Sequence, residues 1–186
     1  MITVFTYIER AKMKLMLMAL SFFFFSFSAN SEQNWKIIEN INETNQNKTY
    51  FLVSKQVLSN PPLNSPFENT YSSIMFKCDD KQNLSSFFGF NNKPSIKFSR
   101  TEGIFNVIKV KIKYDKIEES IELYNPRTWK SNFFLMKDNI FFVQKLEQTN
   151  QFTLELNLIN QGKKLFRFDT TGFLLNYNNL KKICSS

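Results

Sequence analysis

The sequence predicts a mainly β protein: an antiparallel β-sandwich or curled sheet with a C-terminal α-helix packed on it. Segments 108–114 and 152–158 alternate apolar and polar residues with a period of two, as strands with one buried face do. Turn-prone pieces rich in Asn, Pro and Gly separate these segments from other short apolar runs. Only the end of the chain changes to helical spacing.

The first 31 residues have the organisation of a secretory signal peptide. A short basic region, Arg10 to Lys14, precedes an apolar run from Leu15 to Phe27 that ends in small residues. This order is typical of an export signal, and the run is shorter than the about 20 residues that a transmembrane helix needs. We therefore expect residues 1–31 to be a signal peptide and residues 32–186 to be a single β-rich domain.

The exact limits of the export segment stay open at this point. Ala29 and Ser31 favour cleavage before Glu32, cleavage after Ser28 fits nearly as well, and Met13 is an alternative start. An uncleaved membrane anchor is the alternative to a cleaved signal. No later segment is apolar enough to span a bilayer, so no stable membrane span is expected after cleavage.

Within the domain, short strands are predicted between turns, over residues 50–58, 73–78, 96–99, 108–114, 120–124, 140–146, 152–158 and 163–168. Lys109, Lys111 and Lys113 lie on the polar side of one of them. We expect Glu119 and Glu122 of the next strand to face these lysines and neutralise them. A stripe of lysines that binds a partner is the alternative.

The end of the chain is predicted to form an amphipathic helix. Its apolar residues recur at helical spacing, namely Phe173, Leu174, Tyr177, Leu180 and Cys184. Residues 169–171 (Asp-Thr-Thr) can cap its start, and Lys181 and Lys182 lie in the last turn, where positive charge is favourable. A helix that lies on a membrane surface is the alternative to one packed on the sheet.

Cys78 and Cys184 are the only cysteines of the chain. Export places them in an oxidising compartment, where an even number of cysteines indicates a disulfide. We therefore expect a Cys78–Cys184 bond that ties the middle of the domain to its end. Two free thiols are the alternative.

The composition removes several classes of function. The chain has no histidine, which excludes Ser-His and Cys-His nucleophilic systems and the commonest metal ligand. The formal net charge of +8 falls to +6 without residues 1–31, and the remaining basic residues are spread along the chain. Because no nucleic-acid-binding signature accompanies the positive charge, we expect no nucleic acid as partner. We expect no cofactor or metal either, although a metal site made of carboxylates stays open.

Few polar groups are placed for catalysis. Asp79-Asp80 and Glu118-Glu119 are acidic pairs, but neighbours on a strand face opposite sides, so neither pair is ready for acid/base chemistry. We therefore expect no enzyme, although catalysis by carboxylates alone stays open.

Trp35 and Trp129 are the candidates for partner binding, because each is large, apolar and able to donate a hydrogen bond. Burial in the core is the alternative for both. The aromatic supply, Phe87, Phe88, Phe90, Phe133, Phe134, Phe141 and Phe142, suits an apolar cavity for a small ligand as well as a filled core.

The order of several features resembles the VasI-type family of type VI secretion-associated exported bacterial proteins. The features are Trp35, the strand that ends in Cys78, residues 111–115 (Lys-Ile-Lys-Tyr-Asp), Trp129-Lys-Ser131, and an ending of the form Phe-x-x-x-Gly…Leu-x-x-x-Cys over 168–184. The similarity spans most of residues 32–186 but consists of sparse positions. It implies a non-catalytic envelope protein with protein partners, associated with a secretion apparatus.

The sequence thus predicts an exported, periplasmic or secreted accessory or binding protein. Two alternatives come from other classes: a carrier of a small ligand or lipid in an aromatic-lined cavity, and a secreted effector. The sequence leaves the molecular partner and the oligomeric state open.

Overall fold

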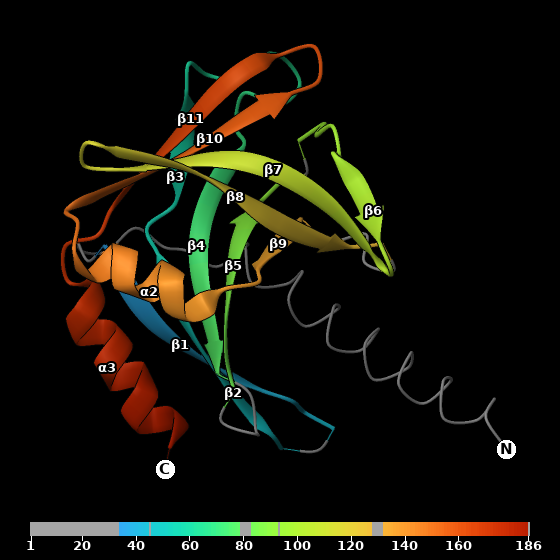
Figure 1. Cartoon of the computed structure of the whole chain (residues 1–186). Coiled ribbons are helices and arrows are strands. Elements are labelled where there is room, and N and C mark those ends of the chain that lie inside the picture. Colours follow the sequence, from blue (N-terminus) through green and yellow to red (C-terminus); the bar gives the residue numbers. More distant parts are fainter. Residues whose placement is uncertain (1–33, 45, 79–82, 93, 128–131, 186) are drawn as a thin grey trace, which may run out of the picture. The chain divides into compact units, whose positions relative to one another are not determined.

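Eight antiparallel strands close into a barrel in the computed structural model of the protein (Figure 1). Around the barrel the order is β4-β3-β11-β10-β7-β8-β9-β5, and β5 pairs again with β4. The structure describes residues 34–44, 46–78, 83–92, 94–127 and 132–185. The elements are β1 (Trp35–Ile41), β2 (Lys48–Ser54), β3 (Val57–Asn60), β4 (Tyr71–Cys78), β5 (Leu84–Phe90), β6 (Arg100–Glu102), β7 (Phe105–Tyr114), β8 (Ile117–Pro126), β9 (Phe133–Met136), α2 (Asn139–Glu147), β10 (Gln151–Leu158), β11 (Gly162–Asp169) and α3 (Phe173–Cys184).

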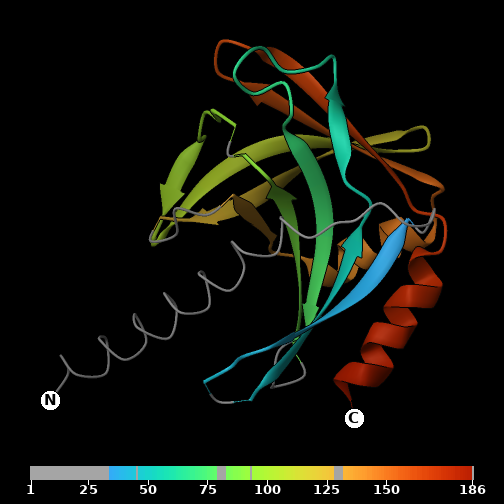
Figure 2. The ribbon, with the colours of Figure 1, turned by 180° about the vertical axis from the view of Figure 1, so that it is seen from behind.

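Two strands of the wall change partners along their length. One edge of β4 pairs with β3 near Tyr71 and with β2 from Met75 to Cys78. The β1–β2 hairpin therefore extends from the wall of the barrel, as Figure 2 shows from behind. Strand β7 likewise has two partners along one of its edges. The start of β7 pairs with β6, and the end of β7 pairs with β10. The mainly β prediction is confirmed, but the sheet closes into a barrel rather than a sandwich.

Aromatic side chains fill the interior of the barrel. Phe76, Phe88, Phe152 and Phe168 are at most 1% exposed. The ring centroid of Phe88 lies 5.9 Å from that of Phe152 and 6.1 Å from that of Phe168, and the Phe76 ring stacks on Phe142 at 6.0 Å. Phe142 of α2 joins them, with ring centroids 5.3 Å from Phe152 and 5.5 Å from Phe88. These contacts fix α2 against the interior.

At another point of the interior, a lysine is buried. Lys164 of β11 is 4% exposed, and its ammonium donates to the carbonyl of Pro62 at 2.6 Å. This bond ties the loop after β3 to β11, because a buried ammonium requires an acceptor.

The predicted C-terminal helix is confirmed as α3, which packs on β1, β2 and β4 (Figure 1). Phe173 lies 4.9 Å from Trp35 and 5.2 Å from Phe76 between ring centroids. The predicted cap is wrong: the residue before the helix is Gly172, with a left-handed φ of 83° and no side-chain bond to the helix. Asp169 instead accepts from the backbone N–H of Thr171, within the turn that precedes the helix.

Several predicted strands are wrong in type or extent. Residues 140–146 lie in helix α2, because Phe142, Val143 and Leu146 reach the core at helical rather than alternate spacing. Residues 96–99 form no strand beyond a single bridge from Ile96 to Leu158. The predicted strand 50–58 is divided between β2 and β3, because residues 55–56 lie outside both strands. Strands β1, β5, β6 and β9 were not predicted.

The described residues contain no helix that is long and apolar enough to cross a membrane. The predicted signal peptide, residues 1–31, lies outside the described residues, and so do Asp79-Asp80 and Trp129.

Candidate functional site

The outward side of the adjacent strands β8, β7, β10 and β11 forms one polar surface, which we call the outer polar face. Its residues follow from the alternation of β7, in which Ile108, Val110 and Ile112 are buried and the intervening lysines are exposed. The register places Glu122 opposite Lys109, and Glu118 opposite Lys113. Across the other edge, Thr153 lies opposite Lys113 and Glu155 opposite Lys111.

Ion pairs neutralise much of this face. Lys111 Nζ lies 2.6 Å from Glu118 Oε1, and Lys163 Nζ lies 3.0 Å from Glu155 Oε1. The hydrogen bond from Lys111 lowers the pKa of Glu118 below its ordinary value. Lys111, Glu118 and Lys163 are solvent-exposed and Glu155 is half-buried, so water screens both pairs and they add little to stability.

Arg100, the first residue of β6, makes two further ion pairs. It holds the carboxylate of Glu122 through both of its terminal nitrogens, one of them at 2.9 Å, and it also donates to Glu102 at 2.8 Å. The hydrogen bond from Arg100 lowers the pKa of Glu122 to about 2. Arg100 therefore carries out much of the neutralisation that the sequence assigned to the lysines.

Glu119 does not face the lysine row as predicted. Residues three apart on a strand lie on opposite faces, and the register places Glu119 opposite the buried Ile112. Its carboxylate accepts from the hydroxyl of Tyr114 and lies 3.5 Å from Lys145 Nζ of α2. Glu118, rather than Glu119, joins Glu122 on the outer face.

The cluster of Tyr114, Glu119 and Lys145 connects the β7–β8 hairpin to α2. Lys145 Nζ lies 4.6 Å from the centroid of the Tyr114 ring. Burial raises the pKa of the Tyr114 hydroxyl, and the hydrogen bond with Tyr114 raises the pKa of Lys145. Both groups therefore keep their protons at neutral pH, and the cluster serves as a structural link.

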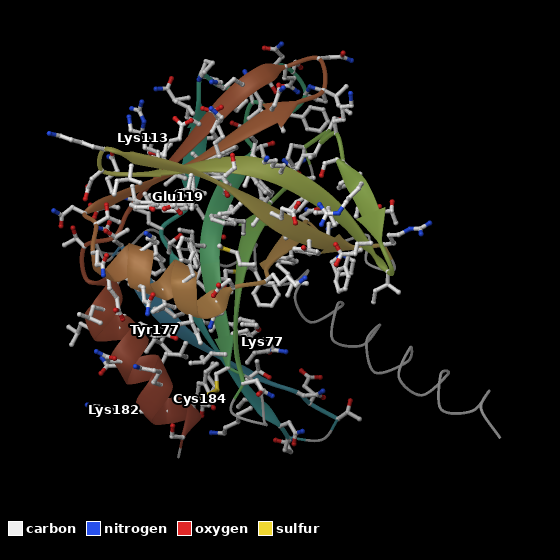
Figure 3. All side chains as sticks on the ribbon, viewed as in Figure 1. Lys77, Lys113, Glu119, Tyr177, Lys182 and Cys184 are labelled. Carbon is white, nitrogen blue, oxygen red and sulfur yellow. A yellow bond between two sulfur atoms is a disulfide. The ribbon has the colours of Figure 1, made fainter. Side chains whose placement is uncertain are left out.

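A hollow of about 290 Å³ lies on the outer polar face. Six charged side chains line it: Lys111, Lys113, Arg167, Asp115, Glu118 and Glu155. Thr153 lies between Lys113 on β7 and Arg167 on β11, directly opposite each of them in the register. Figure 3 labels Lys113 at the end of β7.

Lys113 and Arg167 differ from the other charged residues of the hollow. Glu118 faces Lys113 but makes its ion pair with Lys111, and Glu155 makes its pair with Lys163. Among the described residues, neither Lys113 nor Arg167 has a carboxylate within ion-pair distance, and the hydroxyl of Thr153 has no hydrogen bond. The hollow thus presents two available cations and one available hydroxyl.

The sequence-predicted binding residues do not meet at this site. Trp35 is 1% exposed and packs on Phe173, so it lies in the core, which was the alternative for this residue. Trp129 lies outside the described residues. Of the seven phenylalanines considered for a cavity, Phe88, Phe90, Phe133, Phe134 and Phe142 are buried in the packed protein.

The disulfide Cys78–Cys184 is present, with the two Cα atoms 5.9 Å apart. It joins the end of β4 to the last turn of α3, where Figure 3 labels Cys184. Glu118 and Glu119 lie on opposite faces, as predicted. The described residues contain no group of three Asp, Glu or Cys placed to hold a metal ion.

Sequence reasoning missed Thr153 and Arg167 as members of the hollow. The alternation of residues 152–158 puts Thr153 on a polar face, but only the strand order β7-β10-β11 brings it between two cations. No family model, no curated protein and no solved structure matches the chain at a significant level. The resemblance to the VasI-type family therefore stays a prediction.

Proposed function

We propose that the protein is an exported, non-catalytic binding protein of the bacterial envelope, held together by one disulfide. The observation that carries the proposal is the Cys78–Cys184 bond between two distant parts of the chain. Disulfides persist in oxidising compartments outside the cytosol. The signal-like residues 1–31 give an independent reason for export.

Binding, rather than catalysis, is supported by the distribution of polar groups. The chain has no histidine, and its acidic pair Glu118-Glu119 is divided between two faces of the barrel wall. The interior is occupied by contacting aromatic rings, which favours a scaffold over a carrier. A surface feature such as the outer polar face is then the part available to a partner.

The test is expression of the full chain in a bacterium, followed by cell fractionation and mass spectrometry. We expect a periplasmic product that begins at Glu32 and resists alkylation until it is reduced. A matched variant, Leu17→Arg/Leu20→Arg, interrupts the apolar run and is expected to stay in the cytoplasm with both thiols alkylated. Wild-type protein that keeps residues 1–31 and two reactive thiols would contradict the proposal.

The association with a secretion apparatus rests on the family resemblance alone. Its test is capture of partners from the periplasmic fraction by the purified protein, with a surface variant as control. Recovery of secretion components by the wild type, and their loss with Lys113→Glu, would support the association. Equal recovery of secretion components by the wild type and by Lys113→Glu would show that Lys113 of the outer polar face does not contact them.

A further inference from the structure

We propose that the hollow on the outer polar face binds a small soluble oxyanion, a carboxylate or a phosphate, through Lys113, Thr153 and Arg167. The proposal rests on the function proposed above only in treating this face as a binding surface. It names the chemical class of the ligand, which the fold alone leaves open.

The charges of the hollow provide the first reason. Three of its lining residues are cations and three are carboxylates, but they are not equally available. Glu118 and Glu155 are already paired with Lys111 and Lys163. The third carboxylate, Asp115, accepts a hydrogen bond from the hydroxyl of Thr149 at 2.9 Å. The lining charges without an ion pair among the described residues are therefore the two cations Lys113 and Arg167 and the one carboxylate Asp115, which leaves an excess of positive charge.

The register provides the second reason. Lys113, Thr153 and Arg167 stand in one row across three adjacent strands, on the same face. Adjacent strands lie about 4.8 Å apart, so the two cations start about 10 Å from each other with the threonine between them. Their long side chains can converge above the hydroxyl group. An arginine fork, an ammonium and a hydroxyl together match the several acceptor atoms of an oxyanion.

The surroundings favour a small soluble anion over an anionic membrane. Asp115 lines the same hollow, and its negative charge, which no ion pair offsets among the described residues, would oppose the approach of a continuous anionic surface. A small anion needs only the space above Thr153, between Lys113 and Arg167 in the register. The volume of about 290 Å³ suits a ligand of small size, at the lower end of ordinary ligand sites.

The experiment is a titration of the purified protein with sodium phosphate and with sodium acetate at constant ionic strength, followed by ¹⁵N NMR. We expect saturable shifts centred on the Thr153 amide and the Arg167 side chain. Lys113→Gln and Arg167→Gln should each weaken the apparent affinity at least about ten-fold, because each removes a charge-assisted hydrogen bond to the anion. The double variant should abolish saturation.

Lys109→Gln is the matched control, because Lys109 lies on the same strand and the same face but outside the hollow. It removes the same charge and should change the affinity less than two-fold. Shifts that do not saturate, or an equal loss with Lys109→Gln, would overturn the proposal. Unfolding by urea should be the same for the wild type and the four variants, which separates loss of binding from loss of fold.

A second arm distinguishes the source of the anion. Vesicles of phosphatidylglycerol are mixed with the protein and sedimented, and we expect the protein to stay in the supernatant. Sedimentation that is lost in the Lys113→Gln/Arg167→Gln variant would replace the soluble ligand with a lipid surface and overturn the proposal. Export and alkylation are measured separately, so failure here leaves the proposed function standing.

Discussion

Arg100 sits between two carboxylates, Glu102 and Glu122, at the edge where β6, β7 and β8 meet. A guanidinium presents donors in a fixed plane and can bond two acidic groups at once. Lys109 lies directly opposite Glu122, yet the carboxylate bonds the arginine. The planar donors of the guanidinium, rather than the position directly opposite in the register, determine which cation pairs with Glu122.

This arrangement predicts the titration of Glu122. Arg100 lowers the pKa of Glu122 to about 2, against about 4.3 for a free glutamate. Because the folded-state pKa is the lower one, the ionised carboxylate stabilises the fold above about pH 4.3. That contribution is lost as the pH falls towards 2. A ¹³C NMR titration of the Glu122 side chain should therefore have its midpoint near 2.

The variant Arg100→Gln should return the midpoint of Glu122 to near 4.3. Lys109→Gln is the control, since Lys109 makes only the smallest of the contributions to this pKa. Its midpoint should stay near that of the wild type. A wild-type midpoint above 4 would show that Arg100 does not hold the carboxylate in solution.

Phe142 is the residue through which α2 enters the core. It is fully buried, and its ring contacts those of Phe76, Phe88 and Phe152. Phe142→Ala should lower the free energy of unfolding by about 3–5 kcal/mol, because it removes apolar contacts and leaves a cavity. Urea unfolding measures the change.

Ile140→Ala is the matched control for Phe142→Ala. Ile140 lies two residues earlier on the same helix but is 73% exposed, so its truncation should change stability by no more than about 0.5 kcal/mol. Similar losses for the two variants would mean that α2 does not pack on the barrel through Phe142.

At the scale of elements, α2 explains a wrong prediction. Its sequence Ile-Phe-Phe-Val-Gln-Lys-Leu is a short apolar run, and periodicity alone cannot separate a buried strand from a short helix in such a run. The signal for a helix was Asp138, whose carboxylate accepts from the backbone N–H of Phe141 at 2.9 Å. A capping residue two positions before the apolar run that begins at Ile140 would have favoured the helix.

The helix α3 was predictable because its period, its last-turn lysines and its cysteine agreed. The disulfide joins α3 to β4 across a sequence separation of 106. In the chain-entropy treatment a loop of that size is worth about 4.7 kcal/mol, and removal of a native disulfide commonly costs about 2–5 kcal/mol. Cys78→Ser/Cys184→Ser should lower stability within that range.

Hydrogen exchange distinguishes a local effect of the disulfide from a global one. In the double variant the amides near residues 181–184 should exchange faster than those near Phe173, which is held by Trp35 and Phe76. Chemical reduction of the wild type is the control and should give the same pattern. Unchanged exchange in the last turn would contradict a role of the bond in fixing α3.

At the scale of the whole molecule, the alternation of residues 108–114 and 152–158 gave the inward faces of β7 and β10 correctly. It could not give the strand order, because a strand with one buried face is compatible with a sandwich or a barrel. Closure depends on β5 and β9, whose sequences Leu-Ser-Ser-Phe-Phe-Gly-Phe and Phe-Phe-Leu-Met lack clean alternation. The row of Lys113, Thr153 and Arg167 could not be predicted from the sequence for the same reason, because it forms only when β10 lies between β7 and β11.

Gly89 lies in the strand that closes the barrel, where β5 pairs with β4 on one side and with β9 on the other. A Cβ atom at this position would lie 2.9 Å from Met75 Cε and 2.9 Å from a ring carbon of Phe133. The methionine end can move, but the ring of Phe133 is 8% exposed and cannot yield freely in a packed site. Gly89→Ala should therefore destabilise the protein by about 1–3 kcal/mol.

A double-mutant cycle in urea separates this clash from a general effect of alanine in the strand. Phe133→Leu removes the ring atoms that the new methyl group would meet, so the loss in Gly89→Ala/Phe133→Leu should be smaller than the sum of the two single losses. Interaction energies between residues in contact are about 0.5–3 kcal/mol. Strictly additive losses, or a Gly89→Ala variant as stable as the wild type, would mean that the closing strand leaves more room between β4 and β9 than this packing allows.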